Sequence, residues 1–150
     1  MARLPGAILF ACNLNRVRSP MAAGLMRRLF GAGVYVDSCG LRPDPNKELD
    51  PFVLAAMDEV GVDLTGHHAK TFDDLEDGSF DVVISLTPEA HHRALEMARR
   101  RAVDILYWPT PDPTWVSGSR DVVMEAYRDL RERLEARILE RFPQVRTFGG

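Results

Sequence analysis

The stretch AILFACNLNRVRSP occupies residues 7–20 and combines three local signals in one short segment. Ala7 to Ala11 form a continuous apolar run, which is typical of a strand buried on both faces of a sheet. A polar loop, residues 12–18, comes next, and Ser19-Pro20 then has the pattern of an N-cap with proline in the first helical position. The stretch therefore predicts a strand, a loop and a helix in immediate succession.

The same alternation continues along the rest of the chain. Further strands are predicted at residues 34–38, 81–86 and 104–107, and further helices at about 50–60, 88–101 and 119–141. Strands that alternate with helices imply right-handed crossovers and a parallel sheet with helices on both faces. We therefore expect an α/β fold, a three-layer doubly wound four-stranded parallel sheet, that forms a single domain over residues 1–150.

The composition is that of an ordinary globular protein. Hydrophobic residues make up 45% of the 150 positions, and the formal net charge of −3 argues against nucleic acid as the main partner. The only cysteines, Cys12 and Cys39, provide no disulfide framework, and no apolar stretch has the length of a signal-peptide core or a membrane span. We expect a cytoplasmic monomer that binds no membrane. No residue cluster has the spacing of a metal site, so we expect neither a metal nor another cofactor.

Two predicted loops lie at one edge of the sheet. Residues 12–18 and 109–115 each follow a strand, and ligands of parallel sheets bind beyond the carboxyl ends of the strands. In the first loop, backbone N–H groups and the following helix N-terminus favour an anion and the thiolate form of Cys12. Arg18 has the planar fork that binds two phosphate oxygens, and the hydroxyl of Ser19 can donate to the sulfur. These residue types indicate thiol-based phosphoryl transfer.

The second loop carries a candidate acid. Asp112 lies among three prolines in the segment WPTPDPTW, residues 108–115, and prolines restrict the direction in which a side chain points. A carboxyl group held there is able to protonate a leaving group and then deprotonate water. We expect Trp115 to wall the entrance and to stack on an aromatic leaving group, and Trp108 to belong to the core.

Several segments resemble the low-molecular-weight protein tyrosine phosphatase family. Residues 8–25, ILFACNLNRVRSPMAAGL, are similar to its signature, C-x-G-N-x-C-R-S-P-M-A-E-G. Further similar segments, in the same order as in the family, are Asp37-Ser38-Cys39-Gly40, Gly66-His67-His68-Ala69-Lys70, Phe80 to Ser85 and Asp112-Pro113.

The resemblance implies a role for each matching residue. Cys12 is the nucleophile, Arg18 the phosphate ligand and Asp112 the general acid. Asn15 holds the strained loop through bonds to neighbours that include Ser38 and His67, and asparagine suits left-handed backbone angles. The residues expected to bind substrate are Asn13, Leu14, Asn15, Arg16, Val17, Ser19 and Trp115.

Three positions depart from the family pattern. Leu14 replaces a glycine, and a leucine with positive φ at this point would cost on the order of 1 kcal/mol or more. Arg16 replaces a small or apolar residue and adds a second positive charge close to the thiolate. Val17 replaces the cysteine that protects the nucleophile in many members, so a backup disulfide between Cys12 and Cys39 is a hypothesis.

The expected activity is metal-independent hydrolysis of phosphate monoesters, either phosphotyrosine in proteins or small aryl phosphates, through a phospho-cysteine intermediate. One alternative is an arsenate reductase on the same fold. Since no cysteine follows Cys39, that activity requires Cys39 or an external thiol to replace the usual second cysteine. The other alternative is a phosphate-binding module that has lost turnover through Leu14 and Arg16.

Overall fold

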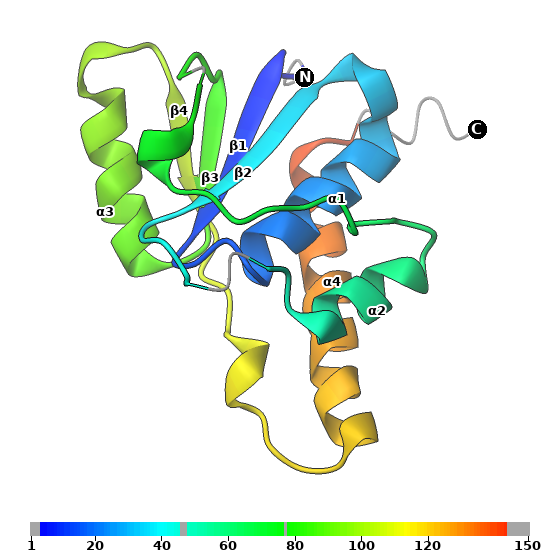
Figure 1. The fold of residues 1–150 in the computed structure, drawn as a ribbon. Coiled ribbons are helices and arrows are strands. Elements are labelled where there is room, and N and C mark those ends of the chain that lie inside the picture. Colours follow the sequence, from blue (N-terminus) through cyan, green and yellow to red (C-terminus); the bar gives the residue numbers. More distant parts are fainter. Residues whose placement is uncertain (1–3, 46–47, 77, 144–150) are drawn as a thin grey trace.

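The computed structural model describes residues 4–45, 48–76 and 78–143. One parallel sheet with the strand order β2-β1-β3-β4 lies at its centre (Figure 1). The strands are β1 (Ala7–Cys12), β2 (Tyr35–Gly40), β3 (Val82–Ser85) and β4 (Asp104–Tyr107). Because the chain starts in the middle of the sheet and winds outward in both directions, the fold is the doubly wound α/β arrangement that the sequence predicts.

Helices cover both faces of the sheet (Figure 1). The first face is covered by α1 (Arg18–Phe30), α2 (Pro51–Asp58) and α4 (Arg120–Arg141), and the other by α3 (Pro88–Met97). The short 3-10 helices are η1 (Gly31–Gly33), η2 (Phe72–Asp74), η3 (Ala98–Arg100) and η4 (Pro113–Trp115). Among the described residues, no helix is both long and apolar enough to cross a membrane.

Strand β1 contributes to the core on both sides of the sheet. Ile8, Phe10 and Cys12 belong to the core cluster under α1, α2 and α4, whereas Leu9 and Ala11 belong to the cluster under α3. Neighbouring side chains of a strand point to opposite faces, so a continuous apolar run is what a central strand with two buried faces requires.

Two of the predicted element boundaries next to the phosphate-binding edge need correction, and the helix predicted over residues 88–101 ends at Met97. Strand β2 extends beyond Ser38 to Gly40, because its parallel pairing with β1 continues to the pair Cys12 and Gly40. Helix α1 begins at Arg18, and its N-cap is Val17, which makes no side-chain capping hydrogen bond. The cap predicted at Ser19 is wrong because the Ser19 hydroxyl is buried and hydrogen-bonded to other side chains.

Candidate active site

The loop between β1 and α1, residues 12–18 and called the phosphate loop below, turns at Asn15. Asn15 has a φ of 58°, and it is the only non-glycine residue with positive φ in the described part of the chain. The left-handed conformation therefore falls on the residue type that tolerates it best after glycine. Leu14 has no positive φ, so the strain considered for a leucine at that position does not arise.

The side chain of Asn15 is fully buried and ties the phosphate loop to two distant segments. Its Nδ2 donates to Ser19 Oγ at 2.8 Å and to Ser38 Oγ at 2.9 Å, and its Oδ1 accepts from the backbone N–H of Lys70 at 3.1 Å. The ring of His67 reaches the Asn15 carbonyl oxygen through Nε2 at 2.9 Å. The structure thus brings together Asn15, Ser38 and His67, the three residues that the family resemblance groups.

His67 is held in its neutral form in the fold. A carbonyl oxygen only accepts, so Nε2 must carry the proton that is donated to Asn15. Burial lowers the pKa of His67 below its ordinary value, and the bond to the Asn15 carbonyl opposes this in part. A neutral Nε2–H tautomer therefore supports the loop at neutral pH.

The thiol of Cys12 lies at the end of β1 and meets the first turn of α1. Cys12 Sγ is 2.9 Å from Ser19 Oγ, which also lies 3.3 Å from the carbonyl oxygen of Cys39. Ser19 accepts a bond from Asn15 and has one proton to donate. When the sulfur is a thiol, the Ser19 hydroxyl can donate its proton to the Cys39 carbonyl oxygen. When the sulfur is a thiolate, the hydroxyl can rotate and donate to the sulfur instead.

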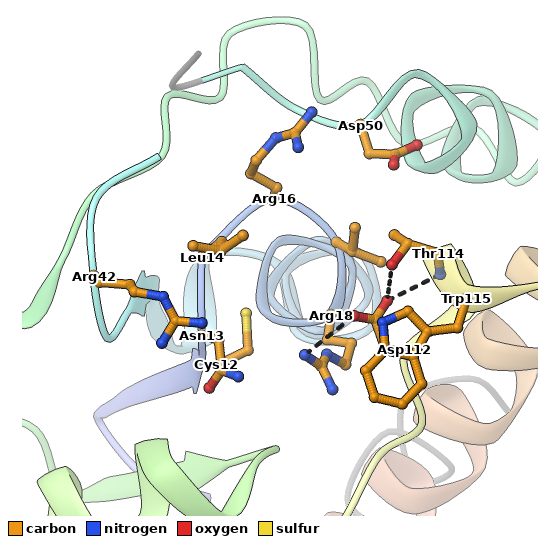
Figure 2. A pocket seen from close by; sticks show the side chains of 11 residues that line it. Cys12, Asn13, Leu14, Arg16, Arg18, Arg42, Asp50, Asp112, Thr114 and Trp115 are labelled. Carbon is orange, nitrogen blue, oxygen red and sulfur yellow. Dashed lines mark hydrogen bonds and ion pairs between the residues drawn. The ribbon is translucent and has the colours of Figure 1, made fainter. Parts of the chain in front are cut away.

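Arg18 joins the phosphate loop to the segment after β4. Its guanidinium donates through Nη1 to the carbonyl oxygen of Thr110 at 3.0 Å and is 3.8 Å from Asp112 Oδ2 through Nη2. The other carboxylate oxygen of Asp112 accepts from the backbone N–H of Thr114 at 2.9 Å and from its hydroxyl at 2.6 Å (Figure 2). This turn and the ion pair place the carboxyl group of Asp112 beside the cavity that contains Cys12.

The cavity at this edge of the sheet has a volume of about 430 Å³. Its lining comes from the phosphate loop, the segments after β2 and β4, and the start of α2: Cys12, Asn13, Leu14, Arg16, Val17, Arg18, Arg42, Asp50, Asp112, Thr114 and Trp115. Asn15 and Ser19, which were predicted to bind substrate, do not line it. Both are fully buried behind the loop, so they support it instead.

Three lining residues were not identified from the sequence: Arg42, Asp50 and Thr114. A usable signal existed for Arg42, which follows the end of β2 and so lies at the same sheet edge as Cys12. Asp50 comes before α2 as its N-cap and accepts from the backbone N–H of Phe52 at 2.8 Å. Its other oxygen accepts from the hydroxyl of Tyr127 at 3.0 Å.

Arg16 lines the cavity but does not bring its charge next to the sulfur. Its Nε donates to the carbonyl oxygen of Glu48 at 2.8 Å, and its Nη1 lies 3.4 Å from Asp44 Oδ2. In Figure 2 the guanidinium points away from Cys12. The predicted second charge close to the thiolate is therefore wrong for this residue, because Asp44 and Glu48 hold the side chain.

The two tryptophans have different surroundings. Trp115 is 86% exposed at the rim of the cavity, where its indole lies in front of the Asp112 loop (Figure 2). Trp108 is only 7% exposed, and its ring lies 6.3 Å from the ring of Phe10 in the core. Both positions are those predicted from the sequence.

The hypothesis of a Cys12–Cys39 disulfide is wrong for this fold. Both cysteines are free and buried. Cys39 is the register partner of Ala11, so its side chain points to the face covered by α3, whereas Cys12 points to the opposite face. Burial also raises the pKa of Cys39, which keeps it an unreactive thiol.

No group of three or more histidine, cysteine or carboxylate residues that could hold a metal ion occurs in the described part of the chain. The charged groups that face the cavity are arginines and two aspartates. A cationic cavity above a thiol has the chemistry to bind an oxyanion and to attack it.

Comparisons with known proteins find relatives of this chain both in sequence and in fold. The sequence model described as low molecular weight phosphotyrosine protein phosphatase matches residues 7–146. A glutaredoxin arsenate reductase from Synechocystis is 28% identical over 131 residues, covering 87% of this chain and 92% of that protein. The structure of a YwlE mutant from Bacillus subtilis superposes with a TM-score of 0.76 at 23% identity, over 93% of this chain and 98% of that one. A low molecular weight protein tyrosine phosphatase from T. tengcongensis gives 0.74 at 21% identity, over 92% and 98%.

Proposed function

Since the chain belongs to the low molecular weight phosphotyrosine protein phosphatase family, we propose that it hydrolyses aryl phosphate monoesters through a phospho-cysteine. The substrates are phosphotyrosine in proteins or small aryl phosphates, and no metal ion takes part. Arg18 and the N-terminus of α1 supply the positive charge that the phosphoryl group requires.

In the first step the Cys12 thiolate attacks phosphorus. The S–P bond forms while the bond from phosphorus to the ester oxygen breaks, and Asp112 gives its proton to the departing oxygen. Arg18 binds two of the phosphoryl oxygens. To do so, its guanidinium must exchange some of its contacts with Thr110 and Asp112 for contacts with the substrate. The ion pair with Asp112 is long, at 3.8 Å, so little is lost when it breaks.

In the second step water hydrolyses the phospho-cysteine. Asp112, now a carboxylate, takes a proton from the water as its oxygen bonds to phosphorus, and the S–P bond breaks. The sulfur leaves as a thiolate, and the Ser19 hydroxyl at 2.9 Å donates to it. Inorganic phosphate is released and the starting protonation states are restored.

The observation that carries the proposal is the position of Asp112. A module that only binds phosphate needs cations and N–H groups, and a carboxylate near the bound anion weakens binding. Here a carboxyl group lines the same cavity as Cys12 and is held by two donors of Thr114. A general acid next to a nucleophile therefore supports a catalytic function rather than phosphate binding alone.

The test is hydrolysis of p-nitrophenyl phosphate between about pH 5 and 8, with a chelator present. We expect activity in the wild type, loss of it in Cys12→Ser, and retention in Cys39→Ala, the matched cysteine control on the opposite face of the sheet. Mass spectrometry of the quenched reaction should find one phosphoryl group on the peptide that contains Cys12. A wild type that binds vanadate but releases no product would sink the proposal.

A second candidate is arsenate reduction with an external thiol. It is favoured by the relative from Synechocystis, which is named a glutaredoxin arsenate reductase. Reduction of arsenate to arsenite takes two electrons, which two thiols supply when they form one disulfide. Because Cys39 faces away from the cavity, the second thiol must come from another molecule. This second activity would be supported if the protein forms arsenite only when both glutathione and glutaredoxin are present and does not hydrolyse aryl phosphates.

A further inference from the structure

The cavity has two chemically different walls. In Figure 2 Asp112, Thr114 and Trp115 lie on one side of Cys12, and Arg42 lies on the other. The first wall contains the acid and the aromatic ring that the proposed reaction uses. The second wall contains the guanidinium group of Arg42, which has no role in the proposed reaction.

The backbone of Arg42 is fixed against the phosphate loop. The carbonyl oxygen of Asn13 accepts from the N–H groups of Leu41 at 2.7 Å and Arg42 at 3.1 Å. Just before them, Gly40 packs so closely on the loop that a Cβ there would lie 2.8 Å from Asn13 O and Leu14 C. These contacts fix the position of the Arg42 Cα and Cβ relative to the phosphate loop.

The guanidinium of Arg42 differs from the other two guanidinium groups that line the cavity. Arg16 is bound by Asp44 and Glu48, and Arg18 by Thr110 and Asp112. Within residues 4–45, 48–76 and 78–143, the Arg42 side chain has no hydrogen-bond or ion-pair partner. It is exposed, and in Figure 2 it points toward Asn13 and Cys12.

The carboxylates of the cavity already have partners. Asp112 is bound by Thr114 and Arg18, and Asp50 accepts from the Phe52 N–H and the Tyr127 hydroxyl. Neither group is available to neutralise Arg42. An unneutralised cation at the mouth of an anion site favours a ligand with more negative charge than the phosphoryl group alone.

We propose that Arg42 is a specificity-determining residue that binds an acidic side chain next to the phosphotyrosine of a peptide substrate. The proposal rests on the aryl phosphatase function proposed above and names its substrate class. A phosphotyrosine side chain that enters the cavity leaves the peptide backbone at the rim. At the rim the exposed Trp115 and Arg42 lie on opposite sides, so a peptide across it places a neighbouring side chain within reach of the guanidinium.

The test uses binding, so that it is independent of turnover. Two phosphotyrosine peptides are compared that differ only in having Asp or Asn on both sides of the phosphotyrosine. Calorimetry with the Cys12→Ser variant should show the Asp peptide bound about fivefold more tightly at low salt, with the difference shrinking as salt is added. In Cys12→Ser/Arg42→Gln the ratio of the two dissociation constants should fall to about one, and in Cys12→Ser/Arg42→Lys it should be largely kept.

A matched control removes the same charge elsewhere. Arg99→Gln in the Cys12→Ser background changes an exposed arginine of η3 outside the cavity and should leave the ratio at its original value. If Arg42→Gln weakens both peptides equally, Arg42 acts on the phosphoryl group and the proposal is overturned. Equal binding of the two peptides, or no binding of either, overturns it as well. Hydrolysis of p-nitrophenyl phosphate by the wild type reports on the proposed function separately.

Discussion

The two loops that form the cavity are built in opposite ways. The phosphate loop, residues 12–18, is held from behind by buried side chains: Asn15 and Ser19 are fully buried, and their bonds reach β2 and Lys70. The loop of Asp112, residues 108–116 and called the acid loop below, is held by a short turn to Thr114 and by contacts with Arg18. Its tip is exposed at Trp115.

This difference separates two parts of the proposed reaction. A loop that binds phosphate and orients a thiolate gains from being preorganised, because fixed donors cost no reorganisation during the reaction. An acid that must approach leaving groups of different shape gains from an exposed loop. Substitutions in the phosphate loop should therefore change both stability and activity, whereas substitutions of Asp112 and the exposed Trp115 in the acid loop should change activity alone.

After the loss of activity expected for Cys12→Ser, the largest effect on activity should come from Asp112→Asn. Asparagine keeps an oxygen for the Thr114 turn but has no proton to transfer, so kcat should fall by about 10²- to 10⁴-fold for substrates with poor leaving groups. The free energy of unfolding should change by less than about 0.5 kcal/mol, measured by urea denaturation. Asp63→Asn is the matched control, since Asp63 forms the same kind of turn with Thr65 outside the cavity. A kcat that stays at the wild-type value would remove Asp112 from the mechanism.

Asn15→Ala should cost both stability and activity. It removes the bond that each of two buried serine hydroxyls accepts from Asn15 and the acceptor of the Lys70 N–H, and it places an ordinary Cβ at positive φ. We expect a loss of about 3 kcal/mol in the free energy of unfolding. Asn15→Gly should recover about 1 kcal/mol of this, because glycine relieves the backbone strain without restoring the hydrogen bonds. Equal stability of the two variants would argue against strain at this position.

Gly40→Ala tests the support of the phosphate loop without touching a polar group. The added methyl would lie 2.8–2.9 Å from the backbone of Asn13, Leu14 and Asn15, so the loop has to shift. The expected loss is about 1–3 kcal/mol in stability, together with weaker phosphate binding. Gly66→Ala is the control, because a Cβ there has no atom within 4 Å. Unchanged vanadate affinity in Gly40→Ala would show that the loop tolerates displacement.

Trp115→Ala should have a smaller effect, confined to substrate recognition. The ring is exposed and contributes little to the core, so unfolding should be unchanged. If the indole stacks on aromatic leaving groups, kcat/KM for p-nitrophenyl phosphate should fall by about two- to tenfold relative to an alkyl phosphate. A parallel decrease for both substrates would assign Trp115 a role in shaping the loop instead.

The smallest expected effect is a pH dependence through His67. The fold lowers the pKa of His67 below 6.5, so below that pH the unfolded chain binds a proton more readily than the folded one. The stability contribution is present above pH 6.5 and is lost as the pH falls through the lowered pKa. His67→Gln should reduce this loss, which the urea midpoint at about pH 7 and pH 5 would detect. An identical pH dependence in the two proteins would exclude His67 as its source.

Most of the fold and part of the site are predictable from local sequence. The strand at Ala7–Cys12 agrees with the predicted segment to within a residue, because a buried central strand is a continuous apolar run. The edge strand Asp104–Tyr107 also has the predicted bounds. The start of α1 was predicted wrongly, since a Ser-Pro pair signals a cap only when the serine side chain is available. Here the hydroxyl of Ser19 is bound to Cys12 and Asn15, and no local pattern reveals that.

The sequence by itself determined the order of strand, loop and helix, and with it the candidates Cys12, Arg18 and Asp112. Turn residues, prolines and apolar runs act through the neighbouring backbone, so their effects can be read along the chain. Only the tertiary structure decided that Arg42 faces the cavity, that Arg16 turns away from it and that Cys39 lies on the other face of the sheet. The reason is strand register. Cys39 pairs with Ala11, and a shift of one residue would move its thiol to the face of Cys12.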